Sequence, residues 1–239
     1  MTKIRAILFD VFGTVVDWRG SLIADLTEWG AAQGIAADWT GLAGAWCGAY
    51  APSMDRVRQR AQPWTVLDDL HRESLRALLP QFGVAALDDA RLDDARLEHV
   101  NRVWRRLHPW PDAVAGLARL KQLVVIAALS NGNVALLVDM AKFAGLPWDM
   151  VFGADLCRHY KPDPETYLGA CGLLGLPPDQ VLMAAAHPSD LAAAQRLGLR
   201  TAFIARPLEH GPGQAAADAG GDWDFAVGSI VELADRLEA

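Results

Sequence analysis

The residue best placed for chemistry is Asp10, an aspartate that directly follows the apolar residues 6–9. A short apolar run between a charged start and a Gly-Thr turn predicts a buried strand with Asp10 at its carboxyl end. Reactive groups of open α/β sheets gather outside the carboxyl ends of the strands. A carboxylate there can act as a nucleophile that forms an ester, although an aspartate after a strand is also an ordinary turn former.

Ser130 and Asn131 come directly after a second apolar run, residues 123–129, and Gly132 follows them. Asn-Gly is ordinary chemistry for the turn from a strand into a helix. If the two strands are parallel, the Ser130 hydroxyl and the Asn131 amide lie beside Asp10, where both can donate to an anion.

Lys161 precedes a helix that is predicted over residues 164–174, with Asp163 as its N-cap. A cation before a helix N-terminus opposes the helix dipole, so Lys161 is expected to pair with a negatively charged group. Asp10 is the obvious candidate. Tyr167, on the inner face of the same helix, is expected to supply a phenolic donor.

His187 and Asp190 follow a strand predicted over residues 181–184. Asp190 is expected to orient a water molecule, with His187 beside it. Each also has a purely structural interpretation, because an aspartate here can cap the next helix and a single histidine is often a plain structural residue.

The elements that must position these side chains alternate between strands and helices. The predicted strands cover residues 6–9, 123–129, 150–152, 181–184, 201–204 and 225–227. The predicted helices of this part cover residues 113–121, 134–144, 164–174, 191–197 and 230–237. This alternation predicts an α/β fold with a mostly parallel sheet and right-handed crossovers. The strand ends at Asp10, Ser130 and Ala184 would then face one edge of the sheet.

Residues 21–108 differ, because their apolar positions recur with helical spacing and no strand pattern stands out. Prolines divide this stretch into several helices. The Pro-Trp-Pro sequence at residues 109–111 resists helix and marks a boundary. We therefore predict a core domain of residues 1–16 and 110–239, with a helical cap of residues 17–109 inserted into it.

The composition limits the functions to consider. Hydrophobic residues make up 52% of the 239 residues, enough for a sizeable core, which argues against disorder. The net charge is −7 and no basic run occurs, so nucleic acid is not expected as a partner. The three cysteines match no zinc or redox spacing, and their odd number suits a reducing compartment. Because no signal-peptide pattern and no bilayer-length apolar run occurs, we expect a soluble cytoplasmic protein without membrane contact.

Together these segments resemble the haloacid dehalogenase superfamily, and most closely its type II (S)-2-haloacid dehalogenases. The resemblance runs from Asp10 through the helical insertion to Lys161 and Asp190. It implies a Rossmann-like core with a cap, and a hydrolase that acts on small 2-haloalkanoates. Asp10 displaces the halide, and water then attacks the aspartyl ester to release a 2-hydroxy acid. The implied partners are a small haloacid and halide, no cofactor or metal is implied, and a homodimer is compatible with the resemblance.

The resemblance also assigns roles to the matching residues. Lys161 holds Asp10 and, with Asp190, positions the hydrolytic water, whereas Thr14, Ser130 and Asn131 bind carboxylates. The implied catalytic residues are Asp10, Thr14, Ser130, Lys161, His187 and Asp190. The implied substrate-binding residues are Val11, Phe12, Trp46, Cys47, Tyr50, Asn131 and Tyr167. Met54 and Trp64 join Trp46 and Tyr50 as candidates for an apolar cap wall.

Phe12 separates two branches of the superfamily. The phosphatases carry an aspartate at this position, two residues after the nucleophile, and it serves the leaving oxygen as acid and base. A phenyl ring cannot protonate a leaving alkoxide, whereas a halide leaves without a proton. Phe12 therefore favours dehalogenation.

The cap departs from the family pattern after Trp46, where the family carries an arginine and this chain has Cys47. That arginine receives the halide and pairs with the substrate carboxylate, whereas a thiol is a weak, neutral donor. A slower displacement is expected unless Arg19, Arg56 or Arg58 supplies the cation.

The segment that binds the hydrolytic water in this family also departs from the family pattern. Ala185 and His187 stand where the family usually has serine and asparagine. His187 can still bond to the ester or to water, and it can act as a base. We therefore expect ester hydrolysis with an altered pH dependence.

Two further functions stay open. A superfamily phosphatase would hold Mg²⁺ between Asp10 and Asp190, and magnesium-dependent hydrolysis of p-nitrophenyl phosphate would identify it. A member that binds a carboxylate without turnover is the function that Cys47 favours. Thermal stabilisation by the ligand without product would identify that member.

Overall fold

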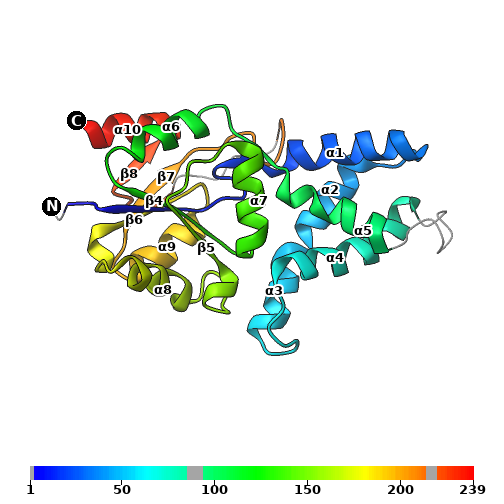
Figure 1. The fold of residues 1–239 in the computed structure, drawn as a ribbon, viewed down its shortest axis with the longest axis horizontal. Coiled ribbons are helices and arrows are strands. Elements are labelled where there is room, and N and C mark those ends of the chain that lie inside the picture. The colour runs from blue at the N-terminus through cyan, green and yellow to red at the C-terminus, as the bar shows by residue number, and fades with distance from the viewer. Residues whose placement is uncertain (1–2, 85–93, 214–219) are drawn as a thin grey trace.

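The computed structural model describes residues 3–84, 94–213 and 220–239. Within them, six parallel strands form one sheet in the order β5-β4-β1-β6-β7-β8 (Figure 1). The strands are β1 (Ala6–Phe9), β4 (Val125–Ser130), β5 (Met150–Gly153), β6 (Val181–Ala185), β7 (Arg200–Ile204) and β8 (Phe225–Val227). The predicted α/β fold is confirmed, with strand boundaries that differ from the expected ones by at most two residues at either end.

The central strand β1 is apolar throughout because both of its faces are covered. Ile7 and Phe9 pack into the core on one face, and Leu8 packs into a second core on the other face. The first face carries α6 (Ala113–Leu120), α7 (Val134–Ala144) and α10 (Ile230–Glu238). The second face carries α8 (Pro164–Leu174) and α9 (Pro188–Arg196).

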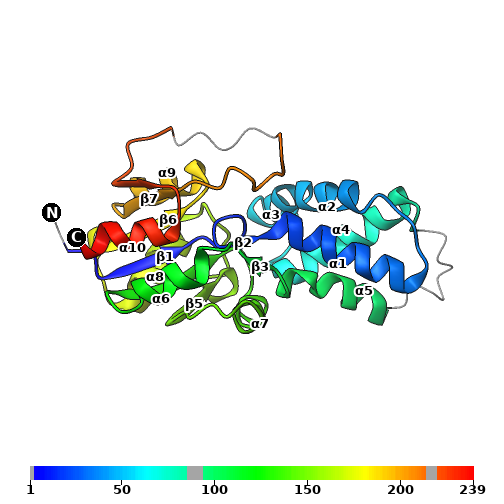
Figure 2. The same ribbon diagram turned by 90° about the horizontal axis from the view of Figure 1, so that it is seen from above.

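A group of helices extends from one end of the sheet (Figures 1 and 2). It contains α1 (Trp18–Gln33), α2 (Trp39–Gly48), α3 (Tyr50–Arg58), α4 (Leu67–Leu78) and α5 (Asp94–Asn101). We propose that this group is the cap domain expected over residues 17–109, of which residues 85–93 lie outside the described residues. Short 3₁₀ helices occur at Leu79–Phe82, Arg102–Arg105, Ala154–Leu156 and Pro178–Gln180.

A two-stranded antiparallel ribbon joins the helical group to the sheet, and the sequence did not predict it. Its strands are β2 (Val16–Asp17) and β3 (His108–Pro109), with Val16 paired to Pro109. Strands of two residues are too short to leave an alternating pattern. The chain therefore enters and leaves the helical group side by side.

The register of the sheet decides which side chains meet. Phe9 is the Cα partner of Ala128 on one side and of Ala184 on the other. Residues that follow these three positions, Asp10 among them, therefore emerge at one edge of the sheet, as predicted. No helix among the described residues has the length and apolar character that a membrane crossing requires.

Candidate active site

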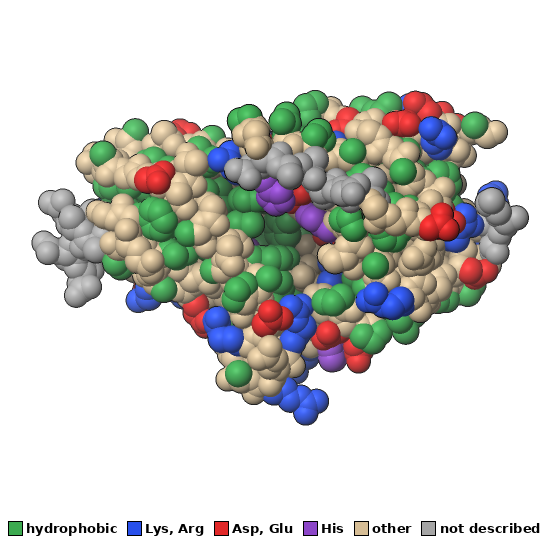
Figure 3. Space-filling view, turned by 180° about the vertical axis from the view of Figure 1, so that it is seen from behind, with side chains coloured by type: hydrophobic (Ala, Val, Ile, Leu, Met, Phe, Trp, Pro, Cys, Tyr) green, Lys and Arg blue, Asp and Glu red, His purple; other side chains and the backbone are tan. Residues whose placement is uncertain are grey.

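A cavity of about 360 Å³ lies at the carboxyl edge of the sheet, between the sheet and the helical group. Figure 3 shows the hollow from behind, with hydrophobic and histidine side chains around it. From the sheet side it is lined by Asp10, Phe12, Asn131, Lys161, Pro162, Tyr167, His187, Ser189, Asp190 and Glu209. From the helical side it is lined by Trp18, Cys47, Tyr50, Ala51, Met54, Arg58 and Trp104.

Lys161 connects two carboxylates at the floor of the cavity. Its ammonium donates to Oδ1 of Asp10 across 2.8 Å and also to Oδ2 of Asp190. The phenol of Tyr167 donates to the other oxygen of Asp190. Burial opposes a charge on Lys161, but Asp10 and Asp190 together raise the pKa of its ammonium above the ordinary value.

Thr14 and His187 fix the other oxygen of Asp10. The Thr14 hydroxyl donates to Oδ2 across 2.6 Å and accepts from the Ala186 backbone N–H across 2.9 Å. Nδ1 of His187 lies 3.1 Å from the same Oδ2. Burial alone would raise the pKa of Asp10, but Lys161 and His187 hold it well below its usual range. Asp10 is therefore a carboxylate with a fixed orientation.

Glu209 completes this group, and the sequence reasoning missed it. Its carboxylate lies 2.9 Å from Nε2 of His187 and accepts a hydrogen bond from Nε1 of Trp18 across 3.2 Å. Burial opposes a charge on His187, but its hydrogen bonds to Asp10 and Glu209 raise its pKa to about 10. No local motif marks Glu209, yet it follows β7, which ends at the same edge of the sheet as β1. That position is the signal that would have found it.

Gly13 makes room for Glu209. Its φ of +80° is in the left-handed region, which suits the tight turn expected after Asp10. A Cβ atom on Gly13 would lie 2.1 Å from Oε1 of Glu209. Glycine is thus required here for the turn and for the close approach of the carboxylate.

The helical group closes the cavity with aromatic rings and one cation. Phe12 meets Tyr50 and Trp104 edge to face, with ring centroids 6.2 and 5.7 Å apart. Arg58 of α3 donates to the backbone oxygen of Lys161 across 2.5 Å, and it pairs with Asp55.

Arg58 is the one of the three candidate arginines that lines the cavity. Arg56 pairs instead with Glu73 at 3.5 Å, and half of its side chain is exposed. Neither Arg56 nor Arg19 is among the described residues of the lining. Cys47 does line the cavity, but burial and the nearby Glu209 raise the pKa of its thiol to about 12, so it stays neutral.

Several predicted site residues lie behind the cavity wall. Trp46 is fully buried and donates from Nε1 to the backbone oxygen of His71 across 3.0 Å. The Ser130 hydroxyl accepts from the Gly132 N–H across 3.1 Å. Val11, Thr14, Trp46 and Ser130 are not among the described residues that line the cavity, and of these four Thr14 bonds to Asp10.

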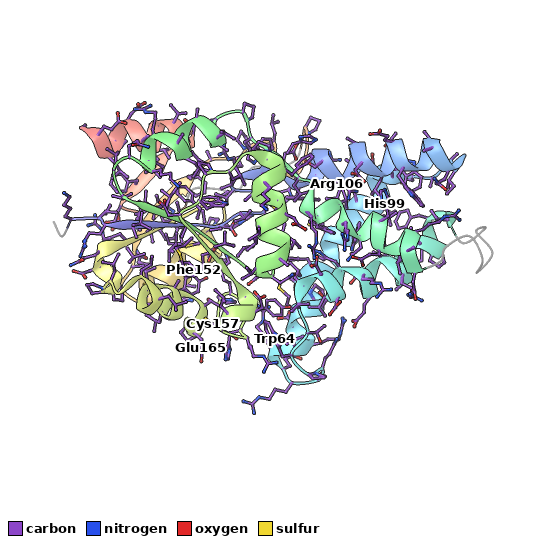
Figure 4. The ribbon with its side chains drawn as sticks, in the orientation of Figure 1. Trp64, His99, Arg106, Phe152, Cys157 and Glu165 are labelled. Atoms are coloured by element: carbon purple, nitrogen blue, oxygen red, sulfur yellow. The ribbon has the colours of Figure 1, made fainter. Side chains whose placement is uncertain are left out.

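Of two other predicted residues, Asn131 lines the cavity and Trp64 does not. Oδ1 of Asn131 accepts from the Lys161 N–H across 2.7 Å. Trp64 packs on Tyr160 with ring centroids 4.9 Å apart, away from the main cavity. In Figure 4, Trp64 lies at the border between the helical group and the sheet.

The oxygens of Asp10 and Asp190 already accept hydrogen bonds from neighbouring side chains. Both oxygens of Asp10 accept hydrogen bonds, from Lys161 on one side and Thr14 on the other. Both oxygens of Asp190 are engaged as well, by Lys161 and Tyr167. Because an ammonium already bridges Asp10 and Asp190, this donor set does not fit Mg²⁺.

Comparisons with known proteins agree with this geometry. The family model described as haloacid dehalogenase-like hydrolase matches residues 4–198. An (S)-2-haloacid dehalogenase of Xanthobacter autotrophicus is 31% identical over 210 residues, which cover 85% of this chain and 76% of the relative. The (S)-2-haloacid dehalogenase 4A of Burkholderia cepacia is 29% identical over 208 residues, covering 85% of this chain and 84% of the relative.

Two solved structures are also similar. The crystal structure of an L-2-haloacid dehalogenase is 52% identical, with a TM-score of 0.93, and the match covers 98% of this chain and 99% of the other. That of a defluorinating L-2-haloacid dehalogenase is 45% identical, with a TM-score of 0.94 and coverage of 99% and 96%. The resemblance expected from the sequence is confirmed: the chain belongs to the haloacid dehalogenase-like hydrolase family.

Proposed function

We propose that the protein is a hydrolytic dehalogenase of small 2-haloalkanoates, of the (S)-2-haloacid dehalogenase type. The observation that carries the proposal is a buried, ionised Asp10 that faces the cavity next to Phe12. Asp10 is a nucleophile in place, and the phenyl ring next to it has no proton to give. That pairing suits a leaving group that departs as an anion without protonation. The names of the relatives and of the similar structures support the same activity.

In the first step, a carboxylate oxygen of Asp10 attacks C2 of the haloacid. The carbon–halogen bond breaks with inversion, and its electron pair leaves with the halide. Hydrogen bonds from Thr14 and Lys161 hold the carboxylate in one orientation, which lowers the entropic cost of the attack.

The substrate carboxylate and the departing halide need a positive environment, which Arg58 and Lys161 supply. Arg58 compensates for the family arginine that Cys47 replaces, because it brings a guanidinium to the cavity from α3. Asn131 adds a polar side chain to the same wall, whereas Phe12, Tyr50 and Met54 enclose the apolar part of a small substrate.

In the second step, water attacks the carboxyl carbon of the Asp10 ester. Lys161, which bonds to both Asp10 and Asp190, positions the water together with Asp190. His187, whose Nδ1 lies 3.1 Å from Oδ2 of Asp10, accepts its proton. The products are a 2-hydroxy acid and the free Asp10 carboxylate, ready for another turnover.

A carboxylate-binding protein without turnover is the alternative that Cys47 favours. Cys47 stays a neutral thiol in the wall, so such a protein would bind the haloacid through Arg58 without assisting halide departure. A magnesium-dependent phosphatase is disfavoured by Phe12 and by the engaged oxygens of Asp10 and Asp190.

The test is halide release from chloroacetate and (S)-2-chloropropionate in the presence of EDTA. Fluoroacetate belongs in the same series, because the structure at 45% identity is of a defluorinating dehalogenase. We expect release by the natural chain and none by Asp10→Asn. Asp179→Asn, the same exchange at an exposed position, is the matched control and should act like the natural chain. Binding of the haloacid without halide release would support the alternative.

A further inference from the structure

We propose that Glu209 is a positioning residue that turns His187 into the general base for hydrolysis of the Asp10 ester. This inference rests on the proposed function and assigns its second step to a particular pair of side chains. Neither the expected aspartyl nucleophile nor the water-positioning role of Asp190 requires Glu209.

The His187 ring lies between two carboxylates. Its Nε2 faces the Glu209 carboxylate at 2.9 Å, and its Nδ1 faces Oδ2 of Asp10 at 3.1 Å. Glu209 is 5% exposed and is itself held by Nε1 of Trp18. A buried carboxylate that accepts a hydrogen bond from one ring nitrogen fixes the orientation of the ring. The other ring nitrogen then points at the reacting group.

Asp190 is already held by two hydrogen-bond donors. Both of its oxygens already accept hydrogen bonds, one from the Lys161 ammonium and one from the Tyr167 phenol. Asp190 can orient a water through Lys161, whereas Nδ1 of His187 faces the Asp10 carboxylate itself, where that water must attack. Nδ1 of His187 gains an unshared electron pair once Asp10 has been esterified.

The charges around His187 explain the change. The groups that face it are Asp10 from the end of β1 and Glu209 from the segment after β7, and Lys161 contacts Asp10 from the segment before α8. In the resting enzyme, the two anions keep His187 protonated, and its pKa is raised to about 10. Formation of the ester removes the charge of Asp10. The imidazolium then gives its Nδ1 proton to solvent, to which 33% of its side chain is exposed.

The resulting cycle is balanced. Neutral His187 takes one proton of the attacking water at Nδ1, and the water oxygen bonds to the carboxyl carbon of Asp10. When the tetrahedral intermediate collapses, its C–O bond to the substrate breaks and its hydroxyl proton passes to the departing 2-hydroxy acid. The Asp10 carboxylate and the imidazolium are regenerated. Each turnover therefore yields one halide, one 2-hydroxy acid and the proton released after the displacement.

The experiment compares Glu209→Gln with Glu165→Gln, which makes the same exchange at a half-exposed position of α8. Quenched-flow measurements give the halide released per enzyme in the first turnover, and intact-mass spectrometry gives the fraction of enzyme esterified. For Glu209→Gln we expect a first-turnover halide burst within about threefold of the natural chain. Steady-state turnover should fall on the order of a hundredfold, with ester accumulating on Asp10.

Two further readouts separate positioning from a general structural effect. The rate of ester hydrolysis should depend on pH differently in Glu209→Gln and in the natural chain, because the carboxylate that faces Nε2 of His187 is gone. Glu209→Asp should recover part of the turnover, since it restores the charge at a slightly longer distance.

The outcomes are distinct. Equal turnover of Glu209→Gln and the natural chain would overturn this inference and leave the proposed function intact. The inference also fails if the halide burst slows as much as turnover and no ester appears, because Glu209 would then serve the displacement. If the natural chain releases no halide from any of the haloacids, the proposed function itself is overturned.

Discussion

The ammonium nitrogen of Lys161 lies 2.8 Å from Oδ1 of Asp10, although 151 residues separate the two in the sequence. The same ammonium bonds to Asp190, so one buried cation stands between two buried carboxylates. Without it, two like charges would share a site of low polarity, and at least one of them would take up a proton. Lys161 therefore controls whether Asp10 is ionised.

Replacing Lys161 by methionine tests this control. The side chain keeps most of its length and loses the ammonium, which leaves Asp10 and Asp190 without their shared partner. Breaking a buried pair in this way costs roughly 3–5 kcal/mol of the free energy of unfolding. Halide release at neutral pH should fall at least ~10²-fold, as when a preorganised electrostatic group is removed.

Urea denaturation and halide release measure the two effects of Lys161→Met. Lys142→Met removes a lysine from an exposed position of α7 and should change neither. If Lys161→Met retained normal turnover, Asp10 would not depend on this ammonium.

Arg58 and Arg56 form a second matched pair, because both lie in the last turn of α3. Arg58 lines the cavity, whereas Arg56 pairs with Glu73 at the surface. A hydrogen bond to a charged group contributes about 1.5–3 kcal/mol, and each 1.4 kcal/mol is a factor of ten in affinity. Arg58→Ala should therefore raise KM for chloroacetate roughly ten- to a hundredfold, whereas Arg56→Ala should leave KM unchanged. Steady-state kinetics of both variants would show it, and equal KM values would remove Arg58 from substrate binding.

The sequence predicted the Asp10–Lys161 contact for a physical reason. A lysine before a helix N-terminus faces the positive end of the dipole and needs an anion, and parallel strands bring their carboxyl ends to one edge. The same reasoning could have placed Glu209 near that edge, because it follows β7, but no motif singles out its side chain. Only the packing of its segment against Trp18 and His187 buries it.

Side-chain direction was also beyond the sequence. Thr14 and Ser130 occupy the expected positions at the sheet edge, yet the Thr14 hydroxyl faces Asp10 and the Ser130 hydroxyl faces the Gly132 N–H. The choice between backbone, carboxylate and cavity depends on rotamers that spacing does not encode. The β2–β3 ribbon was missed because a pairing of two residues has no period to detect.

His71 of α4 should make stability depend on pH. It is 1% exposed, its ring stacks on Trp104 at 4.1 Å, and neither ring nitrogen has a hydrogen-bond partner among the described residues. Burial lowers the pKa of His71 from 6.5 to about 3. Between these values the unfolded chain binds a proton that the folded chain does not, so His71 lowers the free energy of unfolding as pH falls.

His71→Phe removes that contribution and keeps a ring against Trp104. At pH 7 the variant should be more stable by roughly 1–3 kcal/mol, because two unpaired buried nitrogens are gone. The difference should widen as pH falls from 6.5 toward 3. Urea denaturation of both proteins at several pH values measures it, and a constant difference would show that His71 is protonated when folded.

Gly13→Ala tests the close approach of Glu209 to the turn after Asp10. Alanine at a φ of +80° is strained by about 1 kcal/mol, and its Cβ would overlap Oε1 of Glu209, 2.1 Å away. The carboxylate must then move away from His187. The variant should lose turnover through slow ester hydrolysis and accumulate ester on Asp10, in addition to losing stability.

Gly34→Ala is the control for the strain alone. Gly34 ends α1 with a φ of +67°, and an added Cβ would meet nothing within 4 Å. Gly34→Ala should lower the free energy of unfolding by about 1 kcal/mol and leave turnover normal. Because the clash in Gly13→Ala involves the Glu209 carboxylate, adding Glu209→Ala should recover the stability lost to the clash, but neither the stability lost to backbone strain nor the turnover. If Gly13→Ala and Gly34→Ala behaved alike in both measurements, the turn and Glu209 would not be coupled.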